Sequence, residues 1–165
     1  MVICVDTREK PKAIGRIMAE FDRQGVKVVR FGITFADYFN PLRPELVIDR
    51  KQNLLEVAAN VTTDRARFVR EIERCRAAGC RMIVLVEHGG SVRSLEDVIA
   101  WKNPRLRESR YAVSGERLYK IMKAMANYYG IEWQFCNKQS TGRRIIQILG
   151  ADGNEIGRAS CRERV

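Results

Sequence analysis

The hexapeptide Leu46-Val47-Ile48-Asp49-Arg50-Lys51 is typical of a buried β-strand that ends in charged residues. Successive side chains of a strand point to opposite faces of its sheet, so Asp49 and Lys51 share one face and Arg50 lies on the other. An acid and an amine therefore point the same way at the end of a strand. This arrangement is a candidate site, although the same pattern also occurs as a solvated face or a surface ion pair.

A second acid, Asp37, precedes this strand and is separated from it by a turn-rich link that contains Pro41 and Pro44. If the turn folds the chain back as a hairpin, Asp37 comes to lie beside Asp49. Two adjacent carboxylates repel each other unless a positive group lies between them. Mg²⁺ suits such a pair, because it binds one or two carboxylates together with waters and phosphate oxygens. Lys51 would stay protonated beside these acids and stabilise negative charge.

Strand-like and helix-like segments alternate along the rest of the chain. Further strands are predicted at residues 2–5, 26–33, 82–86 and 132–136, and residues 35–46 are predicted to be the turn-rich link. Helices are predicted at residues 12–25, 54–60, 64–78, 94–100, 114–129 and 141–149. The alternation predicts an α/β fold with a central mixed sheet flanked by helices.

The composition indicates a basic globular chain. Thirty Lys and Arg residues stand against twenty Asp and Glu residues in a chain of 165, which gives a net charge of +10 at pH 7. Such a charge favours nucleic acid as a partner, because each neutralised phosphate releases counterions. No apolar run approaches the length of a membrane span, and the N-terminus is too charged for a signal peptide. We therefore expect one domain, no membrane partner and a cytoplasmic protein.

The C-terminal residues 155–165, EIGRASCRERV, break the apolar patterning and resemble the translation of a sequencing adapter. We expect this segment to be a non-native tail and residues 1–154 to form the domain. The cysteines of the domain form no Cys-x-x-Cys pair, and His88 is the single histidine of the chain. The sequence therefore indicates neither a zinc site nor a disulfide framework.

Five short motifs occur in a fixed order along the chain. They are Val5-Asp6-Thr7-Arg8-Glu9, Ala36-Asp37-Tyr38, Asp49-Arg50-Lys51, Arg67-Phe68 and the apolar strand that ends at Glu87. Together they resemble the nuclease domain of XPF-type structure-specific endonucleases. This resemblance implies a restriction-endonuclease-like core and a small stand-alone member of the family from a phage or a bacterium, acting in the cytoplasm of the bacterial or infected cell.

The resemblance also implies the roles of particular residues. Asp37 and Asp49 would bind a divalent metal ion, Mg²⁺ or Mn²⁺, and Lys51 would assist hydrolysis of a phosphodiester. The further residues implied are Asp6, which would line the site as a catalytic residue, and the supporting residues Arg8, Glu9 and Arg67.

Three positions depart from the family's pattern. Asp49 stands where the family has Glu, so the carboxylate reaches less far. Leu55 occupies the position of a final Asp, with Glu56 beside it. Ala36 replaces a Gly, which would matter if the backbone there needs a positive φ. The sequence therefore keeps two acids that could bind metal and one lysine, but it lacks the third acid of the family's pattern.

Exposed cations elsewhere predict contacts with DNA. On the helix predicted from residue 64, arginines lie along a face separate from the apolar stripe. The basic segment that follows Trp101 combines cations and aromatic rings, which suits phosphates and unpaired bases. The residues predicted to contact DNA are Arg50, Arg70, Arg74, Lys102, Arg105 and Arg107. For the helix, a solvated face with an Arg67–Glu71 ion pair is an open alternative.

The favoured hypothesis is an endonuclease, dependent on Mg²⁺ or Mn²⁺, that hydrolyses phosphodiester bonds in branched or flapped DNA during repair or recombination. The preference for branches, or for DNA with single-stranded character, is implied by the resemblance. Two alternatives stay open: a catalytically inactive module that binds branched DNA or a nuclease partner, and a basic nucleic-acid-binding protein without a metal site. The sequence also leaves open a homodimer.

Overall fold

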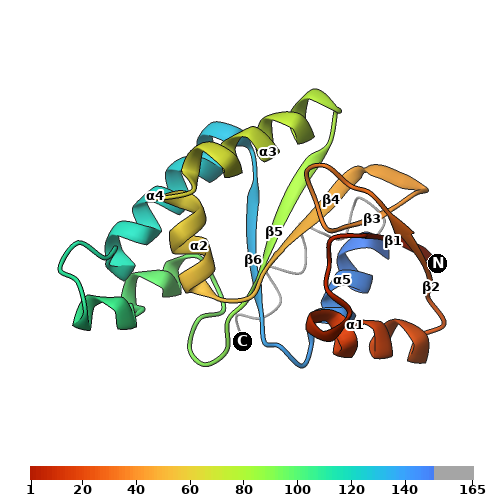
Figure 1. Cartoon of the computed structure of the whole chain (residues 1–165), viewed down its shortest axis with the longest axis horizontal. Coiled ribbons are helices and arrows are strands. Elements are labelled where there is room, and N and C mark those ends of the chain that lie inside the picture. Colours follow the sequence, from red (N-terminus) through yellow and green to blue (C-terminus); the bar gives the residue numbers. More distant parts are fainter. Residues whose placement is uncertain (151–165) are drawn as a thin grey trace, which may run out of the picture.

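The computed structural model describes residues 1–150, which form an α/β fold (Figure 1). The predicted tail, residues 155–165, lies outside the described residues. The strands are β1 (Val2–Asp6), β2 (Lys27–Phe31), β3 (Tyr38–Asn40), β4 (Arg43–Lys51), β5 (Arg81–Glu87) and β6 (Glu132–Cys136). The α-helices are α1 (Pro11–Arg23), α2 (Leu54–Val61), α3 (Arg65–Ala77), α4 (Gly115–Tyr129) and α5 (Thr141–Gly150). Two short 3₁₀ helices, η1 (Glu96–Ala100) and η2 (Pro104–Arg107), precede α4.

The strands form one mixed sheet in the order β2-β1-β3-β4-β5-β6. β1 pairs in parallel with β2, and β4, β5 and β6 pair in parallel with one another. The short strand β3 joins these two parallel groups, because it pairs antiparallel with both β1 and β4. The predicted central mixed sheet is therefore confirmed, and β3 places the β1 end of the chain next to β4.

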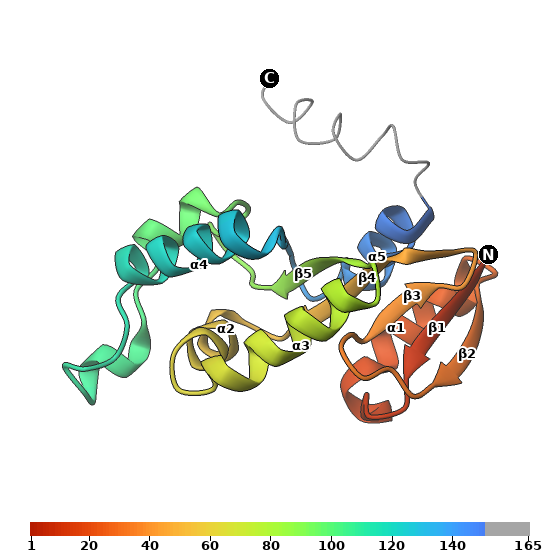
Figure 2. The ribbon, with the colours of Figure 1, turned by 90° about the horizontal axis from the view of Figure 1, so that it is seen from above.

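Helices cover both faces of the sheet. α1 and α5 pack on one face, where Phe21 and Ile48 belong to one apolar core. α2, α3 and α4 pack on the other face, where Val47 and Phe68 belong to a second core. Figure 1 shows α1 and α5 at the lower right and the other three helices to the left. The alternation along β4 explains both cores, because Val47 and Ile48 point to opposite faces. Figure 2 shows the η1–η2 segment and β2 at opposite ends of the molecule.

The predicted helix ends are largely confirmed. Gly25, Gly79 and Gly130 follow α1, α3 and α4 in the left-handed conformation, with φ between 66° and 75°. Ser114 caps α4, because its side-chain oxygen accepts a hydrogen bond from the Arg117 backbone N–H at 3.2 Å. Among residues 1–150, no helix is both long and apolar enough to cross a membrane.

Two local predictions were wrong. The predicted link at residues 35–46 holds β3 and the beginning of β4, and a strand of three residues is too short to show a periodic pattern. Pro44 lies inside β4 but has no partner in the strand register, so its missing N–H interrupts no ladder. The helix predicted at residues 94–100 is the shorter η1, preceded by a turn in which the Asp97 carboxylate accepts hydrogen bonds from the backbone N–H groups of Arg93 and Ser94.

The cysteines of the described residues are free thiols. Cys4 and Cys75 are buried, and burial raises the pKa of Cys75 to about 12. A thiol with so high a pKa carries almost no thiolate at neutral pH, so Cys75 is an apolar core residue and not a nucleophile.

Candidate functional site

The hairpin between β3 and β4 brings Asp37 to the end of β4. Tyr38 lies opposite Ile48 in the antiparallel register, so Asp37 immediately precedes the paired residues. The Asp37 backbone N–H donates to the Ile48 carbonyl at 2.9 Å, and the Arg50 backbone N–H donates to Asp37 Oδ2 at 2.7 Å. Backbone hydrogen bonds therefore hold this carboxylate beside β4, as the sequence predicted.

Asp49 and Lys51 share the face of β4 that points toward α2 and α3. Lys51 Nζ lies 2.8 Å from Asp49 Oδ2, and each residue is only 6% exposed. The ammonium also lies 4.9 Å from the ring centroid of Phe68 on α3, a distance at which a cation is attracted to an aromatic face. Phe68 therefore forms an apolar wall against which the charged pair is held.

Asp37, Asp49 and Lys51 line a polar cleft of about 200 Å³. The cleft is formed where β1, the segment before β3, the end of β4, α2 and α3 meet. Its lining includes the residues Asp6, Arg8, Glu9, Asp37, Asp49, Lys51, Glu56, Asn60, Arg67 and Glu71. We call this the polar cleft; it contains the three residues that the sequence predicted to act together.

The charges of the polar cleft shift the pKa values of its residues. Burial and the nearby carboxylates of Asp49 and Glu9 raise the pKa of Asp37 well above its usual range, against the smaller opposing effects of the Arg50 N–H and Lys51. Burial lowers the pKa of Lys51, but Asp49 and the other acids more than compensate, so the pKa is raised. Lys51 is therefore an ammonium at neutral pH and offsets part of the repulsion between the two aspartates.

The two aspartates fit a hydrated divalent ion. Asp49 Oδ2 is buried and accepts no well-formed hydrogen bond from residues 1–150, apart from its ion-pair contact with Lys51. Within this part of the chain, no group of three or more His, Cys, Asp and Glu side chains converges on one point. Mg²⁺ commonly binds one or two carboxylates and keeps several waters. These two aspartates therefore suit an ion whose remaining ligands are waters or phosphate oxygens.

Asp6 lines the polar cleft, as expected, but both of its carboxylate oxygens already have partners. Its Oδ2 lies 2.6 Å from Arg8 Nε, and its Oδ1 accepts the Ile33 backbone N–H at 3.1 Å. Arg8 Nη2 in turn donates to the Ile33 carbonyl at 2.6 Å, while 63% of the Arg8 side chain stays exposed. Asp6 therefore positions Arg8 at the rim of the polar cleft and fixes the chain after β2.

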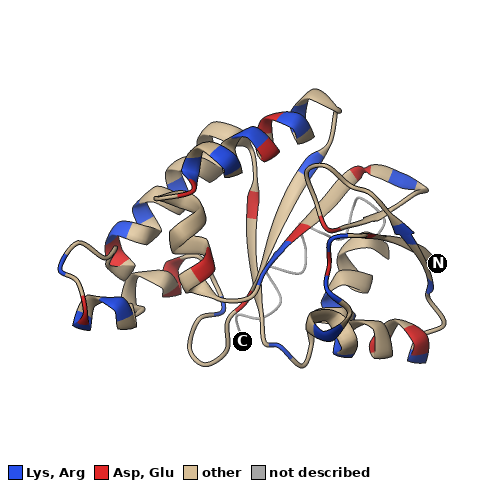
Figure 3. Ribbon diagram, in the orientation of Figure 1, with Lys and Arg blue, Asp and Glu red and all other residues tan. Residues whose placement is uncertain are grey.

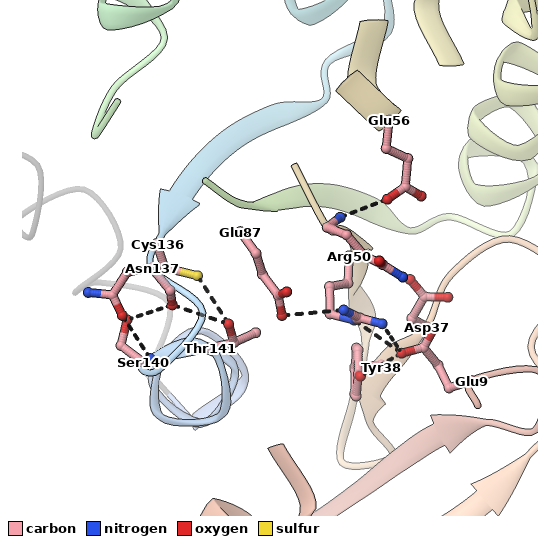
Figure 4. Close-up of polar contacts among 11 residues, drawn as sticks. Glu9, Asp37, Tyr38, Arg50, Glu56, Glu87, Cys136, Asn137, Ser140 and Thr141 are labelled. Atoms are coloured by element: carbon pink, nitrogen blue, oxygen red, sulfur yellow. Dashed lines mark hydrogen bonds and ion pairs between the residues drawn. The ribbon is translucent and has the colours of Figure 1, made fainter. Parts of the chain in front are cut away.

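An ion cluster surrounds the Arg50 side chain on the other face of β4 (Figure 4), and it shares Glu9 with the lining of the polar cleft. Arg50 Nη2 lies 2.8 Å from Glu9 Oε2, and Arg50 Nη1 lies 3.3 Å from Glu87 Oε1. The Tyr38 hydroxyl donates to Glu9 Oε2 at 3.0 Å. The side chains of Arg50 and Glu87 are each only 3% exposed. The interpretation of Arg50 as a DNA contact was therefore wrong, because its guanidinium is buried between two carboxylates.

The supporting arginine, Arg67, lines the polar cleft from α3. Its guanidinium pairs with Asp64 at 3.6 Å, and both side chains are at least half exposed. The alternative pair with Glu71 was therefore wrong, although Glu71 lines the same cleft. An exposed pair of this length is weak, so Arg67 is available to a ligand.

The other predicted DNA contacts lie outside the polar cleft. Arg70 and Arg74 are exposed on α3, where arginines recur along the helix and appear as blue segments in Figure 3. Lys102, Arg105 and Arg107 are exposed in the η1–η2 segment, which does not line the cleft. These contacts stay predictions.

Sequence reasoning missed part of the cleft lining. Asn60 is buried and lies one helical turn after Glu56 on α2, so the spacing of four residues was an available signal. Glu56 Oε2 accepts the Gln52 backbone N–H at 2.7 Å, which makes it part of the cap of α2 as well as a carboxylate of the cleft. Ala36 does not have a positive φ, so its replacement of Gly causes no backbone strain.

Known proteins resemble this chain in sequence family and in fold. The model of the ERCC4 domain matches residues 5–148. XPF from Aeropyrum pernix aligns over 99% of this chain and 66% of its own length, with a TM-score of 0.62 and 20% identity. XPF from Aeropyrum pernix in complex with DNA aligns over 98% of this chain and 73% of its own length, with a TM-score of 0.63 and 18% identity. No curated protein sequence matches the chain.

The structural matches confirm the expected restriction-endonuclease-like fold, with its mixed sheet between helices. The domain match begins at Val5, in the first of the motifs, and extends to Ile148 near the end of α5. It therefore includes every residue of the polar cleft and nearly all of the described chain. On this match the chain belongs to the ERCC4 domain family.

Proposed function

We propose that this protein is an endonuclease that hydrolyses phosphodiester bonds of DNA with Mg²⁺ or Mn²⁺. The observation that carries this proposal is the convergence of Asp37, Asp49 and Lys51 in one polar cleft. Two buried carboxylates and one protonated lysine are groups that can support metal-assisted hydrolysis of a phosphodiester.

Asp37 and Asp49 would hold the metal ion, which supplies polarisation of the phosphate and a nucleophile derived from water. The Lys51 ammonium lies at the same end of β4 and would stabilise negative charge that develops on the phosphate. Its raised pKa favours this electrostatic role over that of a general base. Arg8 and Arg67 on the rim would hold the flanking phosphates.

DNA is proposed as the substrate on two grounds. The net charge of +10 favours a polyanion, and XPF from Aeropyrum pernix has been solved in complex with DNA. The preference for branched or flapped DNA is carried over from the family resemblance. It is the finer part of the proposal and needs its own substrates in the test.

A catalytically inactive module that binds DNA or a nuclease partner is the second candidate. One observation favours it: Leu55 stands at the position of the family's final acid, and no third carboxylate joins a metal-binding group among residues 1–150. The retained Asp37, Asp49 and Lys51 weigh against it, because an inactive site has no need of a buried, mutually repelling acid pair.

The test is a cleavage assay on 5′-labelled flap, fork and nicked duplex DNA with Mg²⁺ or Mn²⁺. Wild type is compared with Lys51→Ala and Asp37→Asn, and Lys12→Ala, an exposed lysine on α1, is the matched control. The proposal expects cleavage by wild type and by the control, and little or none by the two site variants. Equal cleavage by all four proteins would reject the site, and binding without cleavage by wild type would favour the inactive module.

A further inference from the structure

A second hollow adjoins the polar cleft. It has a volume of about 520 Å³ and lies between the β1–α1 loop and the chain that follows β2, with Arg74 of α3 at its edge. Asp6 and Arg8 line both this groove and the polar cleft, so the two hollows meet at these residues. We call it the side groove; its other walls are Thr7 and residues 32–34.

The cations of the side groove are fixed by backbone carbonyls. Arg74 Nη2 donates to the Thr34 carbonyl at 3.2 Å, and Arg8 Nη2 donates to the Ile33 carbonyl at 2.6 Å. Within residues 1–150, Arg74 forms no ion pair with a carboxylate, whereas Arg8 pairs with Asp6. A guanidinium held by a neutral carbonyl keeps its full charge and its remaining N–H donors, which is the arrangement that binds phosphate oxygens well.

A row of arginines on α3 joins the polar cleft to the side groove. Arg67 lines the cleft, Arg74 lines the groove, and Arg70 lies between them at helical spacings of three and four residues. Seven residues of helix rise about 10 Å, which is enough for contacts with successive phosphates of one strand. Glu71 lines the cleft, and Asp64 pairs with Arg67, whereas Arg70 and Arg74 form no ion pair within residues 1–150. The part of the row that leads to the side groove is therefore positive.

We propose that one polynucleotide strand leaves the polar cleft along Arg67 and Arg70 and enters the side groove, where Arg8 and Arg74 bind its phosphates. This inference rests on the proposed function and adds to it the path of the bound strand. The contacts are made to the backbone, so binding by the side groove is independent of base sequence and strongly dependent on salt.

The test measures binding without cleavage. A labelled flap substrate is titrated with protein in EDTA, and fluorescence anisotropy is recorded at several salt concentrations. Arg74→Gln is expected to weaken binding about 3- to 10-fold near 0.1 M salt and to reduce the slope of log K against log salt by about one. The double variant Arg70→Gln/Arg74→Gln should reduce the slope by about two.

Two variants separate loss of a phosphate contact from loss of structure. Arg76→Gln removes an exposed arginine from the same helix, two residues beyond Arg74 and therefore on another side of α3, and should bind as wild type does. Arg74→Lys keeps the charge and should retain the salt slope. If Arg74→Gln merely disturbed the loop at Thr34, Arg74→Lys would lose binding as well, and that result would overturn the proposal.

The possible results distinguish this inference from the proposed function. Wild type that binds in EDTA but fails to cleave with Mg²⁺ or Mn²⁺ rejects the nuclease, while the loss of binding in Arg74→Gln still supports the strand path. Wild type that cleaves, together with a double variant that binds with the affinity and salt slope of Arg76→Gln, rejects the strand path alone. Absence of polynucleotide binding by wild type overturns both.

Discussion

The two faces of β4 carry two charge clusters of opposite character. On one face Arg50 is enclosed by Glu9 and Glu87, with contacts of 2.8 and 3.3 Å and almost no solvent exposure. On the other face Asp49 and Lys51 open into the polar cleft, where Asp37 adds a second carboxylate. The first cluster contains a cation held between acids, whereas the second concentrates acids that repel each other.

The two faces of β4 have different roles, one structural and one in the candidate site. The Arg50 cluster connects β4 with the β1–α1 loop and the end of β5, so it holds three segments together from inside the protein. The cleft cluster leaves Asp37 with a raised pKa, which is a cost to the folded state in the absence of a cation. Alternate side chains of β4 therefore stabilise the fold on one face and prepare a ligand site on the other.

The largest expected effect comes from breaking the buried cluster. Arg50→Met leaves the carboxylates of Glu9 and Glu87 buried without their cation, and we expect the free energy of unfolding to fall by about 3–5 kcal/mol. Urea unfolding followed by circular dichroism measures this change. Lys120→Ala, which breaks an exposed pair with Glu116 on α4, is the control and should cost below about 0.5 kcal/mol. If Arg50→Met were as stable as Lys120→Ala, Arg50 would have no role in stabilising the fold.

The next effect concerns the open face of the same strand. Lys51→Ala removes the ammonium from the polar cleft, and we expect the cleavage rate to fall about 10²- to 10³-fold, as for other losses of a group that stabilises the transition state. Lys51→Arg keeps a positive charge and should recover part of the rate. Single-turnover cleavage of a flap substrate measures both. A rate for Lys51→Ala within threefold of wild type would show that this lysine takes no part in the chemistry.

Removal of the repelling acid should stabilise the protein. Asp37→Asn keeps an oxygen that can accept the Arg50 N–H while it removes one charge, and we expect a gain of about 1 kcal/mol in EDTA at neutral pH. The pKa of the Asp37 carboxyl is raised on folding, so the folded protein holds this proton more tightly than the unfolded chain. The stability that the proton provides is present at low pH and lost as pH rises through the raised pKa.

The advantage of Asp37→Asn should therefore shrink as the solution is acidified, because wild-type Asp37 then becomes neutral as well. Thermal unfolding between neutral pH and pH 4, with both proteins in EDTA, measures the difference. An advantage that grows on acidification would contradict the raised pKa.

The smallest effect on stability is expected at the rim. Arg67→Gln breaks only an exposed contact of 3.6 Å with Asp64, and we expect the free energy of unfolding to change by less than about 0.5 kcal/mol. Cleavage should nevertheless fall several-fold, because Arg67 lines the polar cleft and would contact phosphate. Unfolding and cleavage are measured on the same variant. A loss of stability without a loss of cleavage would show that Arg67 supports the fold and does not contact the substrate.

Local patterns in the sequence predicted the open face of β4 well. The two-residue period of a strand placed Asp49 and Lys51 together, and the prolines before Leu46 suggested the hairpin that carries Asp37. Both inferences use residues near each other in the chain, where strand and turn geometry limit the arrangements. The helix ends at Gly25 and Gly130 were predictable for the same reason.

The buried face could not be predicted in this way. Arg50 pairs with residues on the β1–α1 connection and at the end of β5. The periodic patterns of the sequence do not predict that these distant segments meet. The sheet order and the three-residue strand β3 decide that contact. Helical spacing left an Arg67–Glu71 ion pair open as an alternative, because spacing alone does not show which face of α3 meets the sheet.

The most direct test of the central proposal is a titration with Mn²⁺, followed by electron paramagnetic resonance of the free ion. Wild type should bind Mn²⁺, and Asp37→Asn and Asp49→Asn should each weaken the binding at least about tenfold, because each removes one of the two carboxylates. Glu45→Gln, which removes an exposed carboxylate from the same strand, should bind as wild type does. Binding by Asp37→Asn and Asp49→Asn that equals that of Glu45→Gln would contradict a metal site on this face of β4.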